Sequence, residues 1–280
     1  MATFEARMKR AVLAIQGVKI PELPEEVMQL DQELNSKFAN ASKVAEIIEK
    51  NTTISGTVMQ LAQSPMAKAK QPVTSIRGAV DILGMQNLYN FVVTAALCNM
   101  FKSSRTIKDI MDNSVDVAFC MADLAEWVDG VSRDEAYMLG LFHNVGALML
   151  ATKDAENYKE MYTSYLSKPL SSVVKENELF GCHHGLVGAL VARKWKLNAD
   201  MIQAIMFHHN QNTDNLKGDK PRAMIAMLKI SNMIITEISL GSYQGRESED
   251  YMQSGLEELL LPSEAITELR TAILSYSFKD

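Results

Sequence analysis

The sequence predicts an all-α fold, and three observations support this. Apolar residues recur at spacings of three and four along nearly the whole chain, which is the pattern of helices with one buried face. No continuous alternation of apolar and polar residues appears, as a half-buried strand would require. Hydrophobic residues make up 47% of the 280 residues, which is enough for a sizeable core. We therefore expect two packed helical layers or subdomains.

The first part of the chain predicts six helices and a boundary. We expect the helices at residues 4–16, 25–34, 41–50, 54–63, 75–83 and 85–100, with the last two separated at Gly84. The candidate N-cap residues are Asn40 or Ser42 for the third helix and Thr52 or Thr53 for the fourth. A short polar connector at 102–105 follows, so we expect one helical subdomain over residues 1–105 and another over residues 106–280.

The second part predicts longer helices and two polar loops. We expect helices at residues 108–128, 133–150, 154–166, 171–180, 183–194, 199–209, 221–240 and 263–278. The segments 211–220 and 241–250 are rich in polar residues and glycine, so we expect both to be loops.

The stretch 136–152 is the most apolar segment, and it contains two polar residues. Its sequence is apolar on all sides, which indicates a buried helix. In one continuous helix His143 shares a face with Gly146 and Leu150. A buried His143 or Asn144 without a hydrogen-bond partner costs roughly 1–3 kcal/mol. Other segments are therefore expected to bring polar side chains to this helix.

Composition excludes several classes of protein. With 28 basic and 34 acidic residues the net charge is −6, so we expect no nucleic acid partner. The three cysteines form no CxxC pair, which argues against a disulfide framework or a thiolate zinc site and favours a cytoplasmic location. No apolar run approaches ~18 residues, so we expect no membrane span, and residues 11–15 are too short for a signal peptide.

All five histidines lie in the second half: His143, His183, His184, His208 and His209. In the helix from 183, His184 shares an inward face with Gly188. Gly146 and Gly188 each follow a histidine by about one turn, so two helices can approach closely with an imidazole between them. His208 and His209 are expected to end a helix, where the negative end of the helix dipole stabilises a positive imidazolium.

Two interpretations of these histidines remain open from the residues alone. Several imidazoles with carboxylates can form a hydrolytic metal centre. They can equally be satisfied core and capping residues. Few acids are placed to help a metal, and Glu178, in a polar helix before Gly181, is the candidate.

Several motifs together resemble a known family. The segment LGLFHNVGALML at 139–150 is similar to the His-Asp helix of HD-superfamily phosphohydrolases. The segments PELP at 21–24 and SIRGAVDILG at 75–84, and the run 176–209 with its terminal His-His, resemble the HDOD (HD-related output domain) family. The resemblance covers about residues 18–240. It implies an HD-like multi-helix bundle with an N-terminal helical subdomain.

The resemblance also implies the loss of a metal site. HD hydrolases have His, Asp and Asp ligands at the positions that correspond to Asn113, Asn144 and Asn232 here. Neutral amides are weak ligands and cannot hold two catalytic metals, but they can hydrogen-bond imidazoles. We therefore expect a vestigial pocket, with no metal and no cofactor, made of Asn113, His143, Asn144, His184 and Asn232. The possible accessory residues are Glu178, His183, His208 and His209. A single zinc on His184 with His208 or His209 stays open.

The family implies a signalling role without catalysis. We expect a non-catalytic bacterial regulatory module, not an enzyme, whose partners are signalling proteins. The alternative is a divergent metal-dependent phosphohydrolase acting on a nucleotide or phosphodiester.

Overall fold

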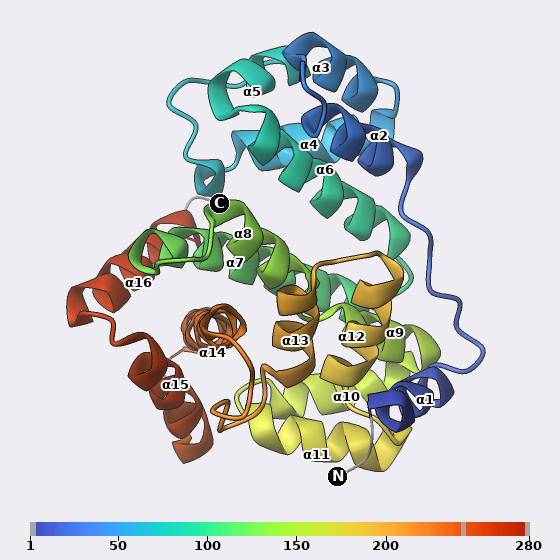
Figure 1. Cartoon of the computed structure of the whole chain (residues 1–280), viewed down its shortest axis with the longest axis vertical. Helices are drawn as coiled ribbons and strands as arrows, with labels where there is room; N and C mark the ends of the chain where they lie inside the picture. The colour runs from blue at the N-terminus through green and yellow to red at the C-terminus, as the bar shows by residue number, and fades with distance from the viewer. Residues whose placement is uncertain (1–3, 242–244, 278–280) are drawn as a thin grey trace. The chain divides into compact units, whose positions relative to one another are not determined.

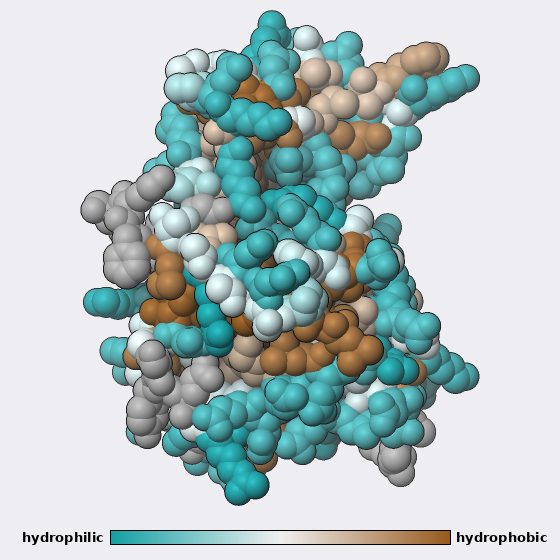
Figure 2. Space-filling model, turned by 90° about the vertical axis from the view of Figure 1, so that its left-hand side faces the viewer, coloured by the Kyte–Doolittle hydropathy of each residue, from teal (hydrophilic) through white to brown (hydrophobic). Residues whose placement is uncertain are grey.

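The structure, a computed structural model, describes residues 4–241 and 245–277. In this part of the chain it contains α-helices, two short 3-10 helices and no strand, so the predicted all-α fold is confirmed (Figure 1). Apolar side chains at helical spacing form the core. The face shown in Figure 2 is mostly hydrophilic, with its apolar side chains in several separate patches.

The chain forms two compact units, which we call the smaller and the larger unit. The smaller unit spans residues 21–102, and the larger one combines residues 1–20 with residues 103–280. This division differs from the predicted subdomain 1–105, because the first helix belongs to the larger unit. Helix α1 (Phe4–Ala14) packs on α12 (His184–Lys194), and Lys153 donates a hydrogen bond of 2.7 Å to the Ala14 carbonyl. Order along the chain gives no sign of that long-range contact.

The smaller unit is a cluster of short helices. They are α2 (Glu25–Leu34), α3 (Ala41–Glu49), α4 (Thr52–Gln63), η1 (Pro65–Ala67), α5 (Ile76–Leu83) and α6 (Met85–Met100). Asn40, one of the two predicted candidates, is the N-cap of α3. The N-cap of α4 is Asn51, so the prediction of Thr52 or Thr53 was wrong. The predicted break between α5 and α6 occurs at Gly84, whose φ of 85° favours glycine.

The larger unit contains the remaining helices. Besides α1 and α12 they are α7 (Arg105–Leu124), η2 (Ala125–Trp127), α8 (Arg133–Phe142), α9 (Val145–Lys153), α10 (Ala155–Tyr165), α11 (Pro169–Phe180), α13 (Ala199–Phe207), α14 (Asp219–Leu240), α15 (Arg246–Leu259) and α16 (Ser263–Ser277). Figure 1 shows α14 almost end-on, and α7, α13 and α15 pack against it. By length and composition alone α14 passes as a membrane span, but 67% of its most apolar stretch is buried inside the unit, as in the core helix of a folded domain.

Helix α15 corrects one sequence prediction. The predicted loop 241–250 ends early, because a helix begins at Arg246; residues 242–244 lie outside the described residues. The segment is highly charged, so its apolar signal is weak. Its buried face carries Tyr251 and Gly255, and Gly255 lies so close to α14 that a β-carbon there would be 2.9 Å from the Ala226 carbonyl oxygen.

The central segment is two helices and not the single helix predicted over 133–150. The chain turns at His143 and Asn144, where Asn144 has φ −96° and ψ 9° and begins α9. Apolar residues continue on both sides of the turn, so the sequence pattern gives no signal of it. The turn places two adjacent polar side chains at the wall of a cavity.

The expected close approach at Gly146 and Gly188 is confirmed. A β-carbon at Gly146 would lie 1.9 Å from the carbonyl oxygen of His184 and 2.5 Å from the backbone nitrogen of Gly188. Helices α9 and α12 therefore touch backbone to backbone. His184 is buried at this crossing, with 6% of its surface exposed, as the predicted inward face requires.

Candidate functional site

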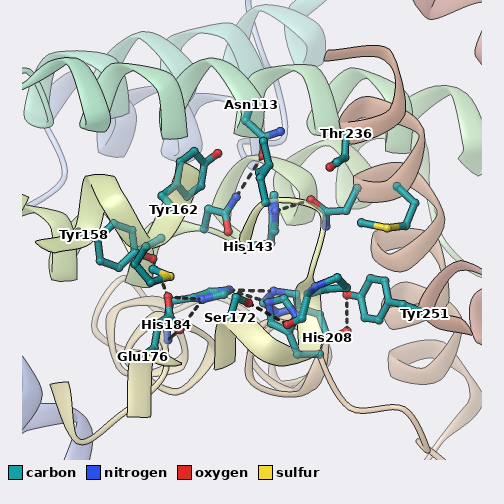
Figure 3. A pocket seen from close by; sticks show the side chains of 18 residues that line it. Asn113, His143, Tyr158, Tyr162, Ser172, Glu176, His184, His208, Thr236 and Tyr251 are labelled. Atoms are coloured by element: carbon teal, nitrogen blue, oxygen red, sulfur yellow. Dashed lines mark hydrogen bonds and ion pairs between the residues drawn. The ribbon is translucent and has the colours of Figure 1, made fainter. Parts of the chain in front are cut away.

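A cavity inside the larger unit brings the predicted pocket residues together (Figure 3). Its empty volume is about 540 Å³, part of which is open to solvent. The predicted residues that line it are Asn113, His143, Asn144, His184 and Asn232, together with the accessory residues His208 and His209. We call it the histidine cavity. Its side chains form two halves, one of amides around His143 and one of imidazoles around His184.

In the amide half, side chains from α7 and α14 meet the α8–α9 turn. The Nε2 atom of His143 lies 3.1 Å from Oδ1 of Asn232 on α14. The Asn144 side-chain amide donates to Oδ1 of Asn113 on α7 at 3.3 Å. The amides of Asn113 and Asn232 thus meet the central segment, as the motif placement expected. Neither amide bonds to His184, so the five residues of the predicted pocket form two separate groups of contacts.

His143 is buried and neutral. Burial, followed in effect by the nearby His184, lowers the pKa of His143 to about 4, although its contacts with Gly140 and Asn232 act in the opposite direction. Its Nδ1 lies 2.6 Å from the Gly140 carbonyl oxygen, so Nδ1 carries the hydrogen and donates. Nε2 then carries a lone pair and is an acceptor. The Asn232 oxygen that faces it is also an acceptor, so it cannot donate a hydrogen bond to Nε2.

In the imidazole half, three histidine nitrogens converge. The Nε2 atom of His184 lies 3.2 Å from Nε2 of His208 and 2.9 Å from Nε2 of His209. Nδ1 of His208 lies 2.8 Å from the Ile205 carbonyl oxygen and donates to it. Burial first, and the neighbouring imidazoles second, lower the pKa of both His208 and His209 well below the usual value. These two side chains are therefore neutral, and Nε2 of His208 presents a lone pair to Nε2 of His184.

The carboxylate behind His184 is Glu176, a residue that the sequence analysis missed. Both carboxylate oxygens lie 2.8 Å from Nδ1 of His184, and the His184 backbone N–H donates to Oε2 at 2.7 Å. The Tyr158 hydroxyl donates to Oε1 at 2.6 Å. Burial raises the pKa of Glu176, but His184 and these hydrogen bonds outweigh it, so the pKa is lowered and the group is charged.

The predicted accessory acid was wrong. Glu178 is largely exposed and pairs with Lys175 at 3.1 Å on the outside of α11. Two residues along a helix is a rotation of about 200°, so Glu176 and Glu178 face opposite ways. The helical period places only one of these two acids on the buried face of α11, and that acid is Glu176.

His183 also lies outside the histidine cavity. It is the residue before α12 and faces a different cavity near Arg7 and Arg10. Burial and then His184 lower the pKa of His183 to about 4, with further lowering by the two arginines, while Glu176 acts in the opposite direction.

Tyrosine side chains complete the histidine cavity and were not predicted. They are Tyr158, Tyr162 and Tyr251. Tyr251, from the unpredicted helix α15, donates to the backbone carbonyl of His208 at 2.7 Å and so fixes the end of α13. The Tyr162 hydroxyl is buried without a hydrogen-bond partner among the described residues. A tyrosine in a polar segment gives no sequence signal of this placement.

The donor set determines what the cavity can hold. The ligand atoms of His184, His208 and His209 lie within 4.8 Å of one another, which fits one ion that prefers nitrogen ligands, such as zinc. Glu176 orients His184 from behind, as carboxylates do for metal-binding histidines. The other half presents the neutral amides of Asn113, Asn144 and Asn232, and these do not fit a second, hard cation.

Comparison with known proteins agrees with this fold. A solved HDOD domain protein of unknown function from Geobacter sulfurreducens is 24% identical, with a TM-score of 0.72 over 97% of this chain and 98% of that one. A proposed phosphohydrolase from Shewanella amazonensis is 19% identical, with a TM-score of 0.68 over 95% and 93%. A proposed signal transduction protein from Marinobacter aquaeolei is 22% identical, with a TM-score of 0.73 over 98% and 65%.

The family itself is identified by sequence. An uncharacterised protein from Treponema pallidum is 20% identical over 193 residues, and the chain spans only 38% of the length of that relative. The model of the HDOD domain matches residues 20–211, which is more than half of the chain and includes the α8–α9 turn, His184 and the His208–His209 pair. The chain therefore belongs to the HDOD family, an HD-related family with an all-α fold.

Proposed function

We propose that this protein is a non-catalytic regulatory module of bacterial signal transduction that works in the cytoplasm by binding other proteins. The observation that carries the proposal is that amide side chains, and not carboxylates, surround His143 in the histidine cavity. Asn113 and Asn144 bond to each other, and Asn232 faces His143. A hydrolytic centre of the HD type needs carboxylates there to bind metal and to activate a water molecule.

The remaining carboxylate does not replace them. Among the described residues that line the histidine cavity, Glu176 is the acidic one, and both of its oxygens are already bonded to His184. Its position behind an imidazole suits an orienting role. A pair of metal ions with a bridging water has no acidic ligand in this cavity.

The three imidazoles fit a single zinc ion, and this is compatible with a structural role. His184, His208 and His209 would bind it, and the ion would link the start of α12 to the end of α13. Its positive charge would be coordinated by the Nε2 atoms that converge there.

The second candidate is a divergent phosphohydrolase. The imidazole cluster favours it, and so does the similarity in fold to proteins described as proposed phosphohydrolases. The similarity to a proposed signal transduction protein supports the first candidate in the same way. The amide half favours the first candidate, because a single nitrogen-bound ion lacks the second metal and the acidic ligands of that chemistry.

One experiment separates the two candidates. The purified chain is incubated with cyclic dinucleotides, nucleotides and a generic phosphodiester, with each divalent ion in turn. We expect no turnover with any of them. In parallel the tagged chain is used to capture proteins from its native lysate, and we expect signalling proteins to be retained. Hydrolysis that is lost in the His143→Ala, His184→Ala double variant would establish the phosphohydrolase instead.

A further inference from the structure

A second cavity lies in the larger unit, where α1 meets the histidine-bearing helices. Its walls come from α1, α11, α12 and α13, and its polar side chains are Arg7, Arg10, Asn177, His183 and Asn210. The empty volume is about 830 Å³, part of which is open to solvent. None of these residues lines the histidine cavity. We call this second space the arginine cavity.

Two positive charges meet in the arginine cavity without a carboxylate. Arg7 and Arg10 are three residues apart on α1 and so occupy neighbouring positions on one face of the helix. Among the described residues, no ion pair or hydrogen bond engages either guanidinium. In a chain with a net charge of −6, two unopposed guanidiniums at one cavity are unusual, and they repel each other unless an anion lies between them.

The guanidinium of Arg7 has a defined position. Its central carbon lies 5.9 Å from the ring centroid of Phe207, which lines the same cavity. Stacking on an aromatic face leaves the edge of the guanidinium, with its N–H donors, free for a ligand.

The lining also contains an imidazole that can hydrogen-bond a ligand. His183 precedes α12, forms no side-chain cap bond, and its Nδ1 is buried without a partner among the described residues. Leu186 and Met206 supply an apolar surface beside it.

We propose that the arginine cavity binds a small molecule through a phosphoryl group, with Arg7 and Arg10 as the principal donors. A phosphate monoester carries nearly two negative charges at neutral pH, which match two guanidiniums, whereas a carboxylate carries one. The volume exceeds that of inorganic phosphate, and the apolar wall accepts the rest of a phosphorylated molecule. This site is independent of the proposed function, because it uses no residue of the histidine cavity.

The two cavities are nevertheless adjacent along the chain. Asn177, His183 and Phe207 of the arginine cavity each directly precede or follow a residue of the histidine cavity, namely Glu176, His184 and His208. Residues 1–19 precede the part of the chain that matches the HDOD model, so the arginines are supplied from outside that match. A bound phosphoryl group would tie α1 to α12.

The test is calorimetric titration of the full chain with inorganic phosphate, a nucleoside monophosphate and acetate. We expect the nucleoside monophosphate to bind best, inorganic phosphate to bind more weakly, and acetate to bind at least about tenfold more weakly than phosphate, because it carries half the charge. Binding of both phosphoryl probes should weaken as the salt concentration rises.

Variants locate the site. Arg10→Gln should weaken binding of the nucleoside monophosphate about tenfold or more, while Lys9→Gln, which removes the same charge from an adjacent exposed position outside the cavity, should leave it unchanged. His208→Gln should also leave it unchanged, since that residue belongs to the other cavity. The proposal is overturned if neither phosphoryl probe binds, if acetate binds as well as phosphate, or if Arg10→Gln and Lys9→Gln have equal effects.

Discussion

Glu176 binds His184 twice, through the ring nitrogen Nδ1 at 2.8 Å and through the backbone N–H at 2.7 Å. One carboxylate thus fixes both the ring orientation of His184 and the first residue of α12. The ring is left with Nε2 pointing at His208 and His209. The geometry of the imidazole half therefore depends on a residue that is not itself among the converging nitrogens.

Glu176→Gln should destabilise the protein, whereas Glu178→Gln should not. The first change removes the charge that the His184 ring and backbone and Tyr158 all contact, at a cost of about 1–3 kcal/mol in the free energy of unfolding. The second removes an exposed pair and should stay within about 0.5 kcal/mol. Chemical denaturation of the two variants beside the wild type measures the difference. Equal effects would mean that the buried carboxylate does not hold the helix start.

His143→Ala should lower stability but not partner binding. The substitution removes the hydrogen bond that His143 donates to the Gly140 carbonyl and opens a void, which together cost about 1–3 kcal/mol plus a cavity term. Asn144→Ala should act in the same direction through Asn113. Thermal unfolding is compared with capture of partners by the fraction that still folds. Unchanged stability with lost capture would show that the cavity binds a ligand and is not merely structural.

The metal content should never exceed one ion per chain. We expect no manganese or iron in protein purified without a histidine tag, and titration with zinc should saturate at one ion or fewer, since three imidazoles converge at one point only. Mass spectrometry of the metals counts them, and His208→Gln should weaken any zinc binding. Two ions per chain would contradict the inference that the amide half binds no metal ion.

Carboxylates at two of the amide positions should create a metal site beside His143. The double variant Asn144→Asp, Asn232→Asp places two charges beside His143, and we expect it to bind a divalent ion that the wild type does not. The matched control is Asn35→Asp, Asn157→Asp, which adds the same charge at exposed positions. Equal metal content in the two variants would show that the amide substitutions are not what prevents binding.

Stability of the metal-free protein should fall as the pH is lowered from 6.5 towards 4. The pKa of His143 is about 4 in the folded protein against 6.5 for an ordinary histidine, so between these values the unfolded chain binds more protons. The free energy of unfolding then falls by up to about 1.4 kcal/mol per pH unit from this residue. His183, His208 and His209 act in the same direction. Denaturation at a series of pH values should give a smaller slope for His143→Asn, and an unchanged slope would refute the assignment.

The sequence predicted the features that depend on local pattern. Helical periodicity indicated nearly all of the helices, and the spacing of His184 and Gly188 indicated the inward histidine and the close crossing of α9 and α12. The family motifs led to Asn113 and Asn232, which the structure places against the central segment.

What the sequence did not predict depends on distant contacts. The turn at His143 lies within an unbroken apolar run, and α15 lies in a charged segment whose buried face is visible only against α14. Helical phase separates Glu176 from Glu178, so local pattern is sufficient to place Glu176, and not Glu178, on the buried side of α11. The convergence of His184 with His208 and His209 required the packing of α12 on α13, which no local pattern specifies.

Gly146 has a consequence that extends beyond the contact between two helices. Since even a methyl group there would collide with the backbone of His184, the absence of a side chain sets the separation of α9 from α12. The amide half of the cavity is carried by the turn just before α9, and the imidazole half begins at the first residue of α12. The distance between the two halves of the cavity is therefore fixed by Gly146, a residue that contributes no functional group to either half.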